Sequence, residues 1–145
     1  MPTYEEIVTE LLSKPNKLIV KKPFTRGVSM DDSYIPDMGV EGLNEFVKYF
    51  YPQLNKKALI IDDRGNGGGN VSPMIIERLR REIAMYIVGR NEGVTTKPAQ
   101  IMNGPKVLLL NKYSASDGDL FPWQFKHYNL GKAIGTRSWG GVVGI

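Results

Sequence analysis

The sequence has no cysteine and one histidine among its 145 residues. Without cysteine, neither a disulfide framework nor a thiolate metal site is possible, and a zinc enzyme is not expected. We therefore predict no metal and no cofactor. Long apolar runs are missing as well: none approaches the roughly 20 residues that span a membrane, and the acid-bearing segment Met1–Lys14 lacks the apolar centre of a signal peptide. The composition predicts a soluble, cytoplasmic protein with no membrane partner.

Charge of one sign is not concentrated in the sequence. Lys and Arg outnumber Asp and Glu by 19 to 15, but the basic residues are scattered, apart from short clusters such as Lys21–Lys22. No interleaving of basic and aromatic residues accompanies them, as it would in many nucleic-acid-binding surfaces. We therefore expect a mildly basic, solvated surface and no nucleic-acid partner.

The length fits one domain with a hydrophobic core, preceded by a short appendage over residues 1–27. Thr3 and Glu6 have the spacing of a capping box, and the helix that they open is expected to end by Lys14, before Pro15. Lys17–Lys22 is predicted to be a strand. A connection rich in Pro, Gly and Ser then leads into a core over residues 28–145.

Strands and helices alternate through this core. The predicted strands are Ala58–Ile61, Lys106–Leu110 and Ala133–Gly135, and the predicted helices are Gly42–Tyr51, Ser72 to about Val88 and Asp117–Tyr128. The first helix turns Leu43 and Phe46 inward, and the second carries Ile75, Ile76, Leu79 and Ile83 on one face. Such alternation predicts an α/β fold with a largely parallel sheet, in which loops at the carboxyl ends of the strands build the site.

Two loops follow predicted strands at that edge. The glycine loop, Asp62–Gly69, reads DDRGNGGG, and the serine loop, Asn111–Asp119, reads NKYSASDGD. We expect the two loops to face each other across one cleft. The glycine loop lacks the Lys-Ser/Thr of a phosphate-binding P-loop, so it either offers backbone N–H groups to an oxyanion or simply turns the chain tightly.

The serine loop offers three candidate nucleophiles, Ser114, Ser116 and, less plausibly, Tyr113. A hydroxyl at the first turn of a helix lies beside unpaired N–H groups and the positive end of the helix dipole, which together can hold a developing oxyanion. The alternative is that a serine here caps the helix.

Three ordered motifs, IIDDRGNGGG, NKYSASDGDLFPWQFK and IGTRSWGGVVGI, make residues 34–145 resemble the catalytic core of tricorn-type serine peptidases, relatives of the carboxy-terminal-processing proteases. The resemblance implies a ClpP/crotonase-like spiral of β-β-α units instead of a doubly wound sheet. It implies that Ser116 is the nucleophile and that the oxyanion donors are the N–H of Asp117 and that of a glycine in Gly67–Gly69, with Gly67 and Gly68 preferred. The Asp117 side chain is then free for capping.

The same resemblance extends to the flanking segments. IPDMG, residues 35–39, matches a core strand and turn of the family, and residues 139–145 are expected beside a channel for a peptide substrate. Thr9–Val20 weakly resembles the last helix and strand of a PDZ module.

The family's base and its orienting acid have no counterpart in the sequence. In that family a histidine from a preceding domain takes the serine proton, and a glutamate beyond the last motif orients it. His127 lies eleven positions after Ser116, roughly 16 Å away along a helix, so we expect it to be a surface or helix-end residue. Lys126 and Lys132 do not match the pattern of related enzymes that use lysine.

We therefore expect a serine peptidase core truncated at both ends and inactive or very weak alone. Its expected partners are a peptide substrate and either complementary protease domains or further copies of the chain. The alternatives are a non-catalytic peptide-binding or assembly module and a crotonase-like acyl-CoA binder.

Three carboxylates depart from the family pattern. Asp31 and Asp32 stand where the family runs an apolar strand, and Asp63 replaces an apolar residue between Asp62 and Arg64. A buried carboxylate without a partner is protonated or costs several kcal/mol. We expect Arg64, Arg26 or a lysine to reach these groups, or the local fold to differ from that of the family.

Overall fold

The computed structural model describes residues 19–20 and 38–143. The predicted helix before Lys14, the connection over Pro23–Ser33, Arg26, Asp31 and Asp32 lie outside the described residues. The division at residue 27 therefore stays a prediction. None of the helices formed by the described residues has the length and apolar character needed to cross a bilayer.

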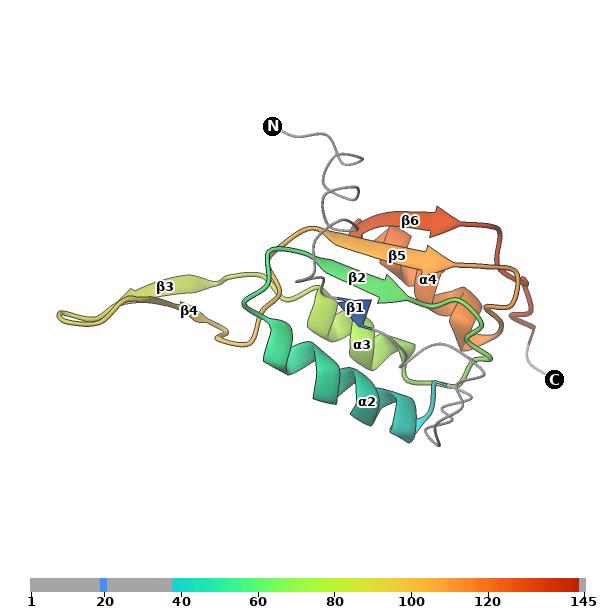
Figure 1. Cartoon of the computed structure of the whole chain (residues 1–145), viewed down its shortest axis with the longest axis horizontal. Helices are drawn as coiled ribbons and strands as arrows, with labels where there is room; N and C mark the ends of the chain where they lie inside the picture. Colours follow the sequence, from blue (N-terminus) through green and yellow to red (C-terminus); the bar gives the residue numbers. More distant parts are fainter. Residues whose placement is uncertain (1–18, 21–37, 144–145) are drawn as a thin grey trace.

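A parallel sheet forms the centre of the described fold, as the sequence predicts. Its four strands, β1 (Ile19–Val20), β2 (Leu59–Asp62), β5 (Lys106–Leu110) and β6 (Gly131–Gly135), lie in the order β1-β2-β5-β6 (Figure 1). Every neighbouring pair is parallel. The strand order follows the chain order, and right-handed crossovers that all step in one direction place their helices on one face. The sheet is therefore not doubly wound.

Three helices formed by the described residues cover that face: α2 (Val40–Phe50), α3 (Ser72–Leu79) and α4 (Asp117–His127). A short 3-10 turn, η1 (Tyr51–Gln53), follows α2. Leu59, Ile61 and Leu108 point toward the helices and share one core cluster with side chains from all three. These partners include Phe46, Phe50, Ile75, Ile76, Leu79, Phe121 and Phe125. Phe46 is buried as expected, while Leu43 is partly buried at the edge of the core.

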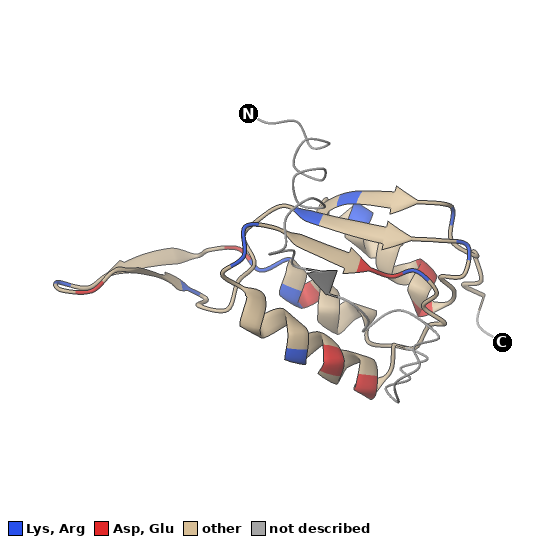
Figure 2. Cartoon of the chain, in the orientation of Figure 1, with Lys and Arg blue, Asp and Glu red and all other residues tan. Residues whose placement is uncertain are grey.

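The middle of the sheet is buried on both of its faces. Leu59, Ile60 and Ile61 are consecutive in β2, so their side chains point alternately to opposite faces, yet each is at most 4% exposed. This burial confirms the reading of the continuous apolar run as a strand covered on both sides. Figure 2 shows Lys and Arg interspersed with Asp and Glu over the described elements.

One predicted helix is wrong over its second half. Helix α3 ends at Leu79, and Met85–Val88 instead forms strand β3, which pairs antiparallel with β4 (Val94–Lys97). The helical spacing of Ile75, Ile76 and Leu79 matches α3, but the helix itself does not extend to Ile83. Tyr86, Ile87 and Val88 are strand-favouring residues, and the loop that follows them is flanked by Gly89 and Gly93, which is typical of a hairpin.

The β3–β4 hairpin extends away from the sheet and helices (Figure 1). All four residues of β3 are exposed, and Tyr86 and Val88 are exposed by 65% and 73%. The hairpin therefore contributes little to the hydrophobic core, which is complete without it.

Candidate functional site

The glycine loop and the serine loop leave the sheet side by side. Strands β2 and β5 are adjacent and parallel, with Asp62 opposite Leu109, so both loops emerge at the carboxyl edge. The N–H of Asp63 donates to the carbonyl of Leu109 at 2.8 Å, and the N–H of Ala115 donates to the carbonyl of Asn66 at 2.8 Å. The expected convergence of the two loops is present.

Ser116 lies at the turn between the serine loop and α4, in a strained backbone conformation. Its φ and ψ are 54° and −119°, which a residue other than glycine rarely adopts. Its carbonyl accepts from the N–H groups of Asp119 and Leu120, so Ser116 occupies the N-cap position. Its side chain makes no capping hydrogen bond, and the residue is exposed. The hydroxyl is thus available to a ligand and not used to cap the helix.

Gly68 packs directly against Ser116. A Cβ placed on Gly68 would lie 2.5 Å from the Cβ of Ser116 and 3.0 Å from its Oγ, and the φ of Gly68 is +105°. Both the close approach and the positive φ require glycine. The next residue, Gly69, is equally constrained because a Cβ there would lie 2.1 Å from the carbonyl oxygen of Met38. The loop is therefore held between Met38 and the serine turn.

The backbone N–H groups near Ser116 differ in whether they are already used. Asp117 is the first residue of α4, where a backbone N–H has no acceptor within its own helix. The N–H of Gly68 donates to Oδ1 of Asn66 at 2.9 Å. For the N–H groups of Gly67 and Gly69, no acceptor is found among the described residues. Of the two preferred glycines, Gly67 thus has the free amide.

The side chain of Asp117 caps a neighbouring helix. Its Oδ2 accepts from the N–H of Ser72 at 2.9 Å, and its Oδ1 accepts from the Ser72 hydroxyl. Ser72 is the first residue of α3, so the carboxylate lies at the N-terminal ends of both α3 and α4. Both helix dipoles favour a negative charge at this place. Asp117 therefore has the expected capping role, although the helix that it caps is α3, which follows the glycine loop, and not its own helix α4.

The two other candidate nucleophiles are arranged differently. Ser114 is fully buried, and its hydroxyl donates to the carbonyl of Asp63 at 2.8 Å, which ties the serine loop to the glycine loop. Tyr113 is 64% exposed and points its ring toward solvent beside Lys112. Ser114 therefore has a structural role, and the strained turn distinguishes Ser116 from both.

Arg64 is not the partner of Asp63. Arg64 pairs with Asp62 through two hydrogen bonds of 2.6 and 2.8 Å. Asp63 is fully buried, and among the described residues no cation contacts it. Its Oδ1 accepts from Nδ2 of Asn66 at 2.7 Å, while its Oδ2 has no partner among those residues. Among the described residues, an amide and not an arginine or lysine satisfies part of this carboxyl; Arg26 lies outside them.

His127 is the last residue of α4 and is exposed, as the sequence predicts. Its ring stacks on that of Trp123, one turn earlier, with centroids 4.9 Å apart. An eleven-residue helix thus separates it from Ser116. His127 does not serve Ser116 as a base within one copy of the chain.

The segment after β6 returns to the serine loop. The N–H of Trp139 donates to the carbonyl of Ser114 at 2.9 Å, and the N–H groups of Gly140 and Gly141 donate to the carboxylate of Asp119 at 2.8 and 3.0 Å. Residues 139–143 therefore run beside the serine turn.

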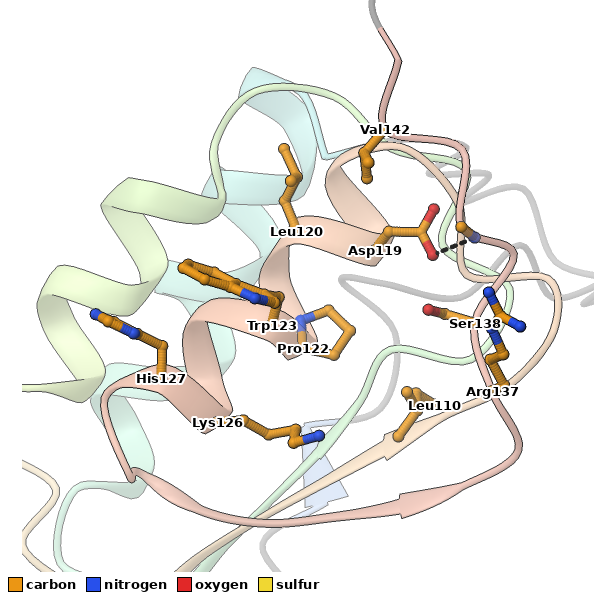
Figure 3. Close-up of a pocket in the computed structure, with 11 residues that line it drawn as sticks. Leu110, Asp119, Leu120, Pro122, Trp123, Lys126, His127, Arg137, Ser138 and Val142 are labelled. Atoms are coloured by element: carbon orange, nitrogen blue, oxygen red, sulfur yellow. Dashed lines mark hydrogen bonds between the residues drawn. The ribbon is translucent and has the colours of Figure 1, made fainter.

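An open groove of about 980 Å³ lies between this segment and α4 (Figure 3). Trp123, Lys126 and His127 form one wall and Arg137 and Ser138 face them from the other side. Ser116 is not among the residues that line the groove, so the groove lies next to the candidate site and is not the site itself.

The sequence reasoning missed two residues that hold the loops in place. Asn66 donates to Asp63, accepts from Gly68, and accepts from Ala115 through its carbonyl. Asp119 fixes the segment after β6. The sequence signal for Asn66 was its place as a polar residue inside a glycine run, where an amide side chain can bond nearby backbone.

Residues 34–145 match the profile of Peptidase family S41. The chain is 45% identical over 112 residues to the tricorn protease of Thermoplasma volcanium, covering 77% of this chain and 11% of that protein. It is 42% identical over 112 residues to the putative tricorn-like protease C-terminal subunit of Sulfurisphaera tokodaii, covering 77% of this chain and 13% of that protein. The chain thus spans about a tenth of the length of these relatives.

Solved structures agree with this match. A crystal structure of the tricorn protease superposes with a TM-score of 0.67 at 46% identity, covering 77% of this chain and 11% of that chain. The photosystem II D1 C-terminal processing protease superposes with a TM-score of 0.52 at 19% identity, covering 72% and 30%. This second likeness concerns the fold alone.

A strand, a strained turn that exposes a hydroxyl, and a helix N-terminus form an arrangement that acyl-transfer hydrolases use. The sequence match over residues 34–145 places the chain in a family of peptidases. The chain belongs to peptidase family S41, and its similarity to tricorn proteases over that range confirms the resemblance.

Proposed function

We propose that this chain is the core of a serine endopeptidase in which Ser116 is the nucleophile. The observation that carries the proposal is the exposed Ser116 hydroxyl, held on a strained turn against Gly68 at the N-terminal end of α4. Strained backbone of this kind persists where the surrounding structure enforces it, and it concentrates at functional sites. Membership of a peptidase family supports the same reading.

In the proposed reaction, Oγ of Ser116 attacks the carbonyl carbon of a peptide and a base takes the serine proton. The N–H of Asp117 and one N–H of the glycine loop stabilise the oxyanion that forms. Gly67 fits the second role best, because the N–H of Gly68 is donated to Asn66. The carbon–nitrogen bond then breaks, the amine leaves with a proton, and water releases the acyl group from Ser116.

The proposal places the base outside the described residues. The hydroxyl of Ser116 makes no hydrogen bond to any residue in the described part of the chain. The family resemblance implies a histidine from a preceding domain and an orienting glutamate from beyond the last motif. Complementary protease domains or further copies of the chain are thus the proposed partners, and the isolated chain is expected to be inactive or very weak.

The finer fold assignment belongs to the same proposal. A ClpP/crotonase-like spiral of β-β-α units is supported by the strand order, which steps in one direction across the sheet, and by the helices gathered on one face. Segment 139–143 is then the edge beside which an extended peptide substrate lies. The protein is proposed to be cytoplasmic.

Active-site labelling tests the nucleophile. A fluorophosphonate forms a bond from phosphorus to a reactive serine oxygen and releases fluoride, so label is expected on Ser116, mapped by mass spectrometry of the digested protein. Ser116→Ala is expected to lose the label. Ser138→Ala, which removes a serine outside both loops, is the matched control and is expected to keep it. The assay is run on the chain alone and with the flanking segments supplied.

Absence of label on Ser116 with those segments supplied, while the chain remains folded, contradicts the proposal. A label that maps to Ser114 contradicts it as well.

The second candidate is a peptide-binding or assembly module without chemistry. It is favoured by one observation, the Ser116 hydroxyl that no described group activates. Peptide affinity unchanged by Ser116→Ala, with no turnover when the flanking segments are supplied, is the result expected from this candidate and not from the peptidase.

A further inference from the structure

Asp63 is a buried acid at the junction of β2 and the glycine loop. The residue is fully buried. Its N–H donates to the carbonyl of Leu109 in β5, and its carbonyl accepts from the Ser114 hydroxyl, each at 2.8 Å. The backbone of Asp63 is thus fixed by the neighbouring strand and by the serine loop. Its side chain has little freedom to move away from Asn66.

Asn66 transmits the position of Asp63 to the serine turn. The Asn66 Nδ2 donates to Oδ1 of Asp63 at 2.7 Å, and its Oδ1 accepts from the N–H of Gly68 at 2.9 Å. Its carbonyl accepts from the N–H of Ala115, the residue before Ser116. Asn66 is 1% exposed, so these bonds do not compete with water. Asp63, Asn66 and Gly68 therefore form a continuous chain of contacts that ends on Ser116.

Buried atoms also indicate the charge state of Asp63. Its Oδ2 is buried and has no hydrogen-bond partner among the described residues, and a buried carboxyl in that position costs less free energy when neutral than when charged. Burial raises the pKa of Asp63 well above its usual range, and the hydrogen bond from Asn66 opposes this in part. Three neighbouring carboxyl groups raise the pKa further, those of Asp62, Asp117 and Asp119.

Each of those three carboxyl groups already has donors. Asp62 is paired with Arg64, Asp117 with Ser72, and Asp119 with two glycine N–H groups. They therefore remain acceptors at the edge where an oxyanion would form. A further negative charge on Asp63 would add to theirs and oppose that oxyanion.

We propose that Asp63 is a positioning residue for the Ser116 site, and that its side chain orients Asn66 so that the glycine loop stays pressed against the serine turn. The catalytic meaning of this proposal rests on the proposed peptidase function, whereas the structural link does not. Asp63 itself touches neither a substrate nor the reacting atoms.

Two variants separate the effect of the hydrogen bond between Asp63 and Asn66 from the effect of a charge on Asp63. Asp63→Asn keeps an acceptor oxygen for Asn66 and cannot ionise, whereas Asp63→Leu has a similar volume and offers no acceptor. In amide NMR spectra of the chain, Asp63→Leu is expected to shift the Gly68 and Ala115 N–H signals and to raise the hydrogen-exchange rate of Gly68 at least tenfold. Asp63→Asn is expected to leave the two N–H signals and the Gly68 exchange rate close to those of the wild type at low pH.

The pH dependence decides the role of the charge. The Gly68 signal of the wild type is expected to titrate as Asp63 ionises, and Asp63→Asn is expected to abolish that titration. Where Asp63→Leu fails to fold, this comparison alone decides the proposal. A Gly68 signal that titrates equally in wild type and Asp63→Asn, or one that is unchanged in a folded Asp63→Leu, overturns it.

The rate at which the fluorophosphonate labels Ser116 gives a separate test. With flanking segments supplied, the labelling rate of the wild type relative to Asp63→Asn is expected to fall as pH rises through the Gly68 titration. A constant ratio of the two rates contradicts the effect on catalysis. If no variant is labelled at any pH, the proposed function fails, and the NMR arm still decides whether Asp63 positions the loop.

Discussion

Replacing Gly68 tests whether the two loops meet as tightly as the structure has them. In Gly68→Ala the new Cβ would lie 2.5 Å from the Cβ of Ser116, and ordinary contact begins at 3.4 Å, so the loops must separate by about 0.9 Å. The φ of +105° adds strain of about 1–2 kcal/mol, and relief of the overlap adds about 1–3 kcal/mol. We expect the free energy of unfolding to fall by about 2–5 kcal/mol.

Thermal unfolding measures this loss of stability. At about 4 °C per kcal/mol for a chain of this size, the unfolding midpoint is expected to fall by roughly 8–20 °C. A displacement near 1 Å at a reacting group is worth about 100-fold in rate, so labelling of Ser116, with flanking segments supplied, is expected to slow by about that factor.

Gly93→Ala is the matched control. A Cβ there meets nothing within 4 Å, and the expected change in stability is no more than about 1 kcal/mol. If Gly68→Ala unfolds at the same temperature as Gly93→Ala and labels as fast as the wild type, the close approach of the loops is refuted.

Three further changes have definite expected outcomes. Asp117→Ala removes the acceptor for Ser72 and should lower the free energy of unfolding by about 1–3 kcal/mol in urea titrations; no change would contradict the cap on α3. Leu108→Ala opens a cavity under the helices and should cost about 2–5 kcal/mol by the same measurement, with a cost under 1 kcal/mol counting against the core described. Because the pKa of Asp63 is raised by burial, the folded state holds its proton longer, so wild-type stability should fall as pH rises from about 3.8 through the folded-state pKa. In Asp63→Asn this loss of stability with rising pH should be absent. An equal pH dependence of the free energy of unfolding in the wild type and in Asp63→Asn would exclude Asp63 as the cause of the loss.

Local sequence patterns predicted the elements that build the site. Strand Lys106–Leu110 was predicted with the bounds that the structure has, and the helix from Asp117 was predicted to within one residue of its end. Both elements combine an unbroken apolar or amphipathic pattern with clear turn residues on each side. The meeting of the two loops followed from parallel strand order alone.

Features that depend on distant residues were not predictable in the same way. The helical spacing of Ile75 to Leu79 continues to Ile83 in the sequence, although cross-strand pairing with Val94–Lys97 makes Met85–Val88 a strand. The hydrogen bonds of Asp117 to Ser72 and of Asn66 to Asp63 depend on side-chain positions set by packing. A sequence motif names such residues without saying which neighbour each one binds.

The backbone at Ser116 also restricts which side chains this turn can carry. Branching at Cβ is a severe outlier when φ is positive, and the Cβ of Ser116 already lies against Gly68. Cysteine shares the unbranched shape of serine, whereas threonine adds a methyl group at the crowded atom. The turn therefore has room for an alcohol or a thiol on a primary carbon, and it excludes the secondary alcohol of threonine.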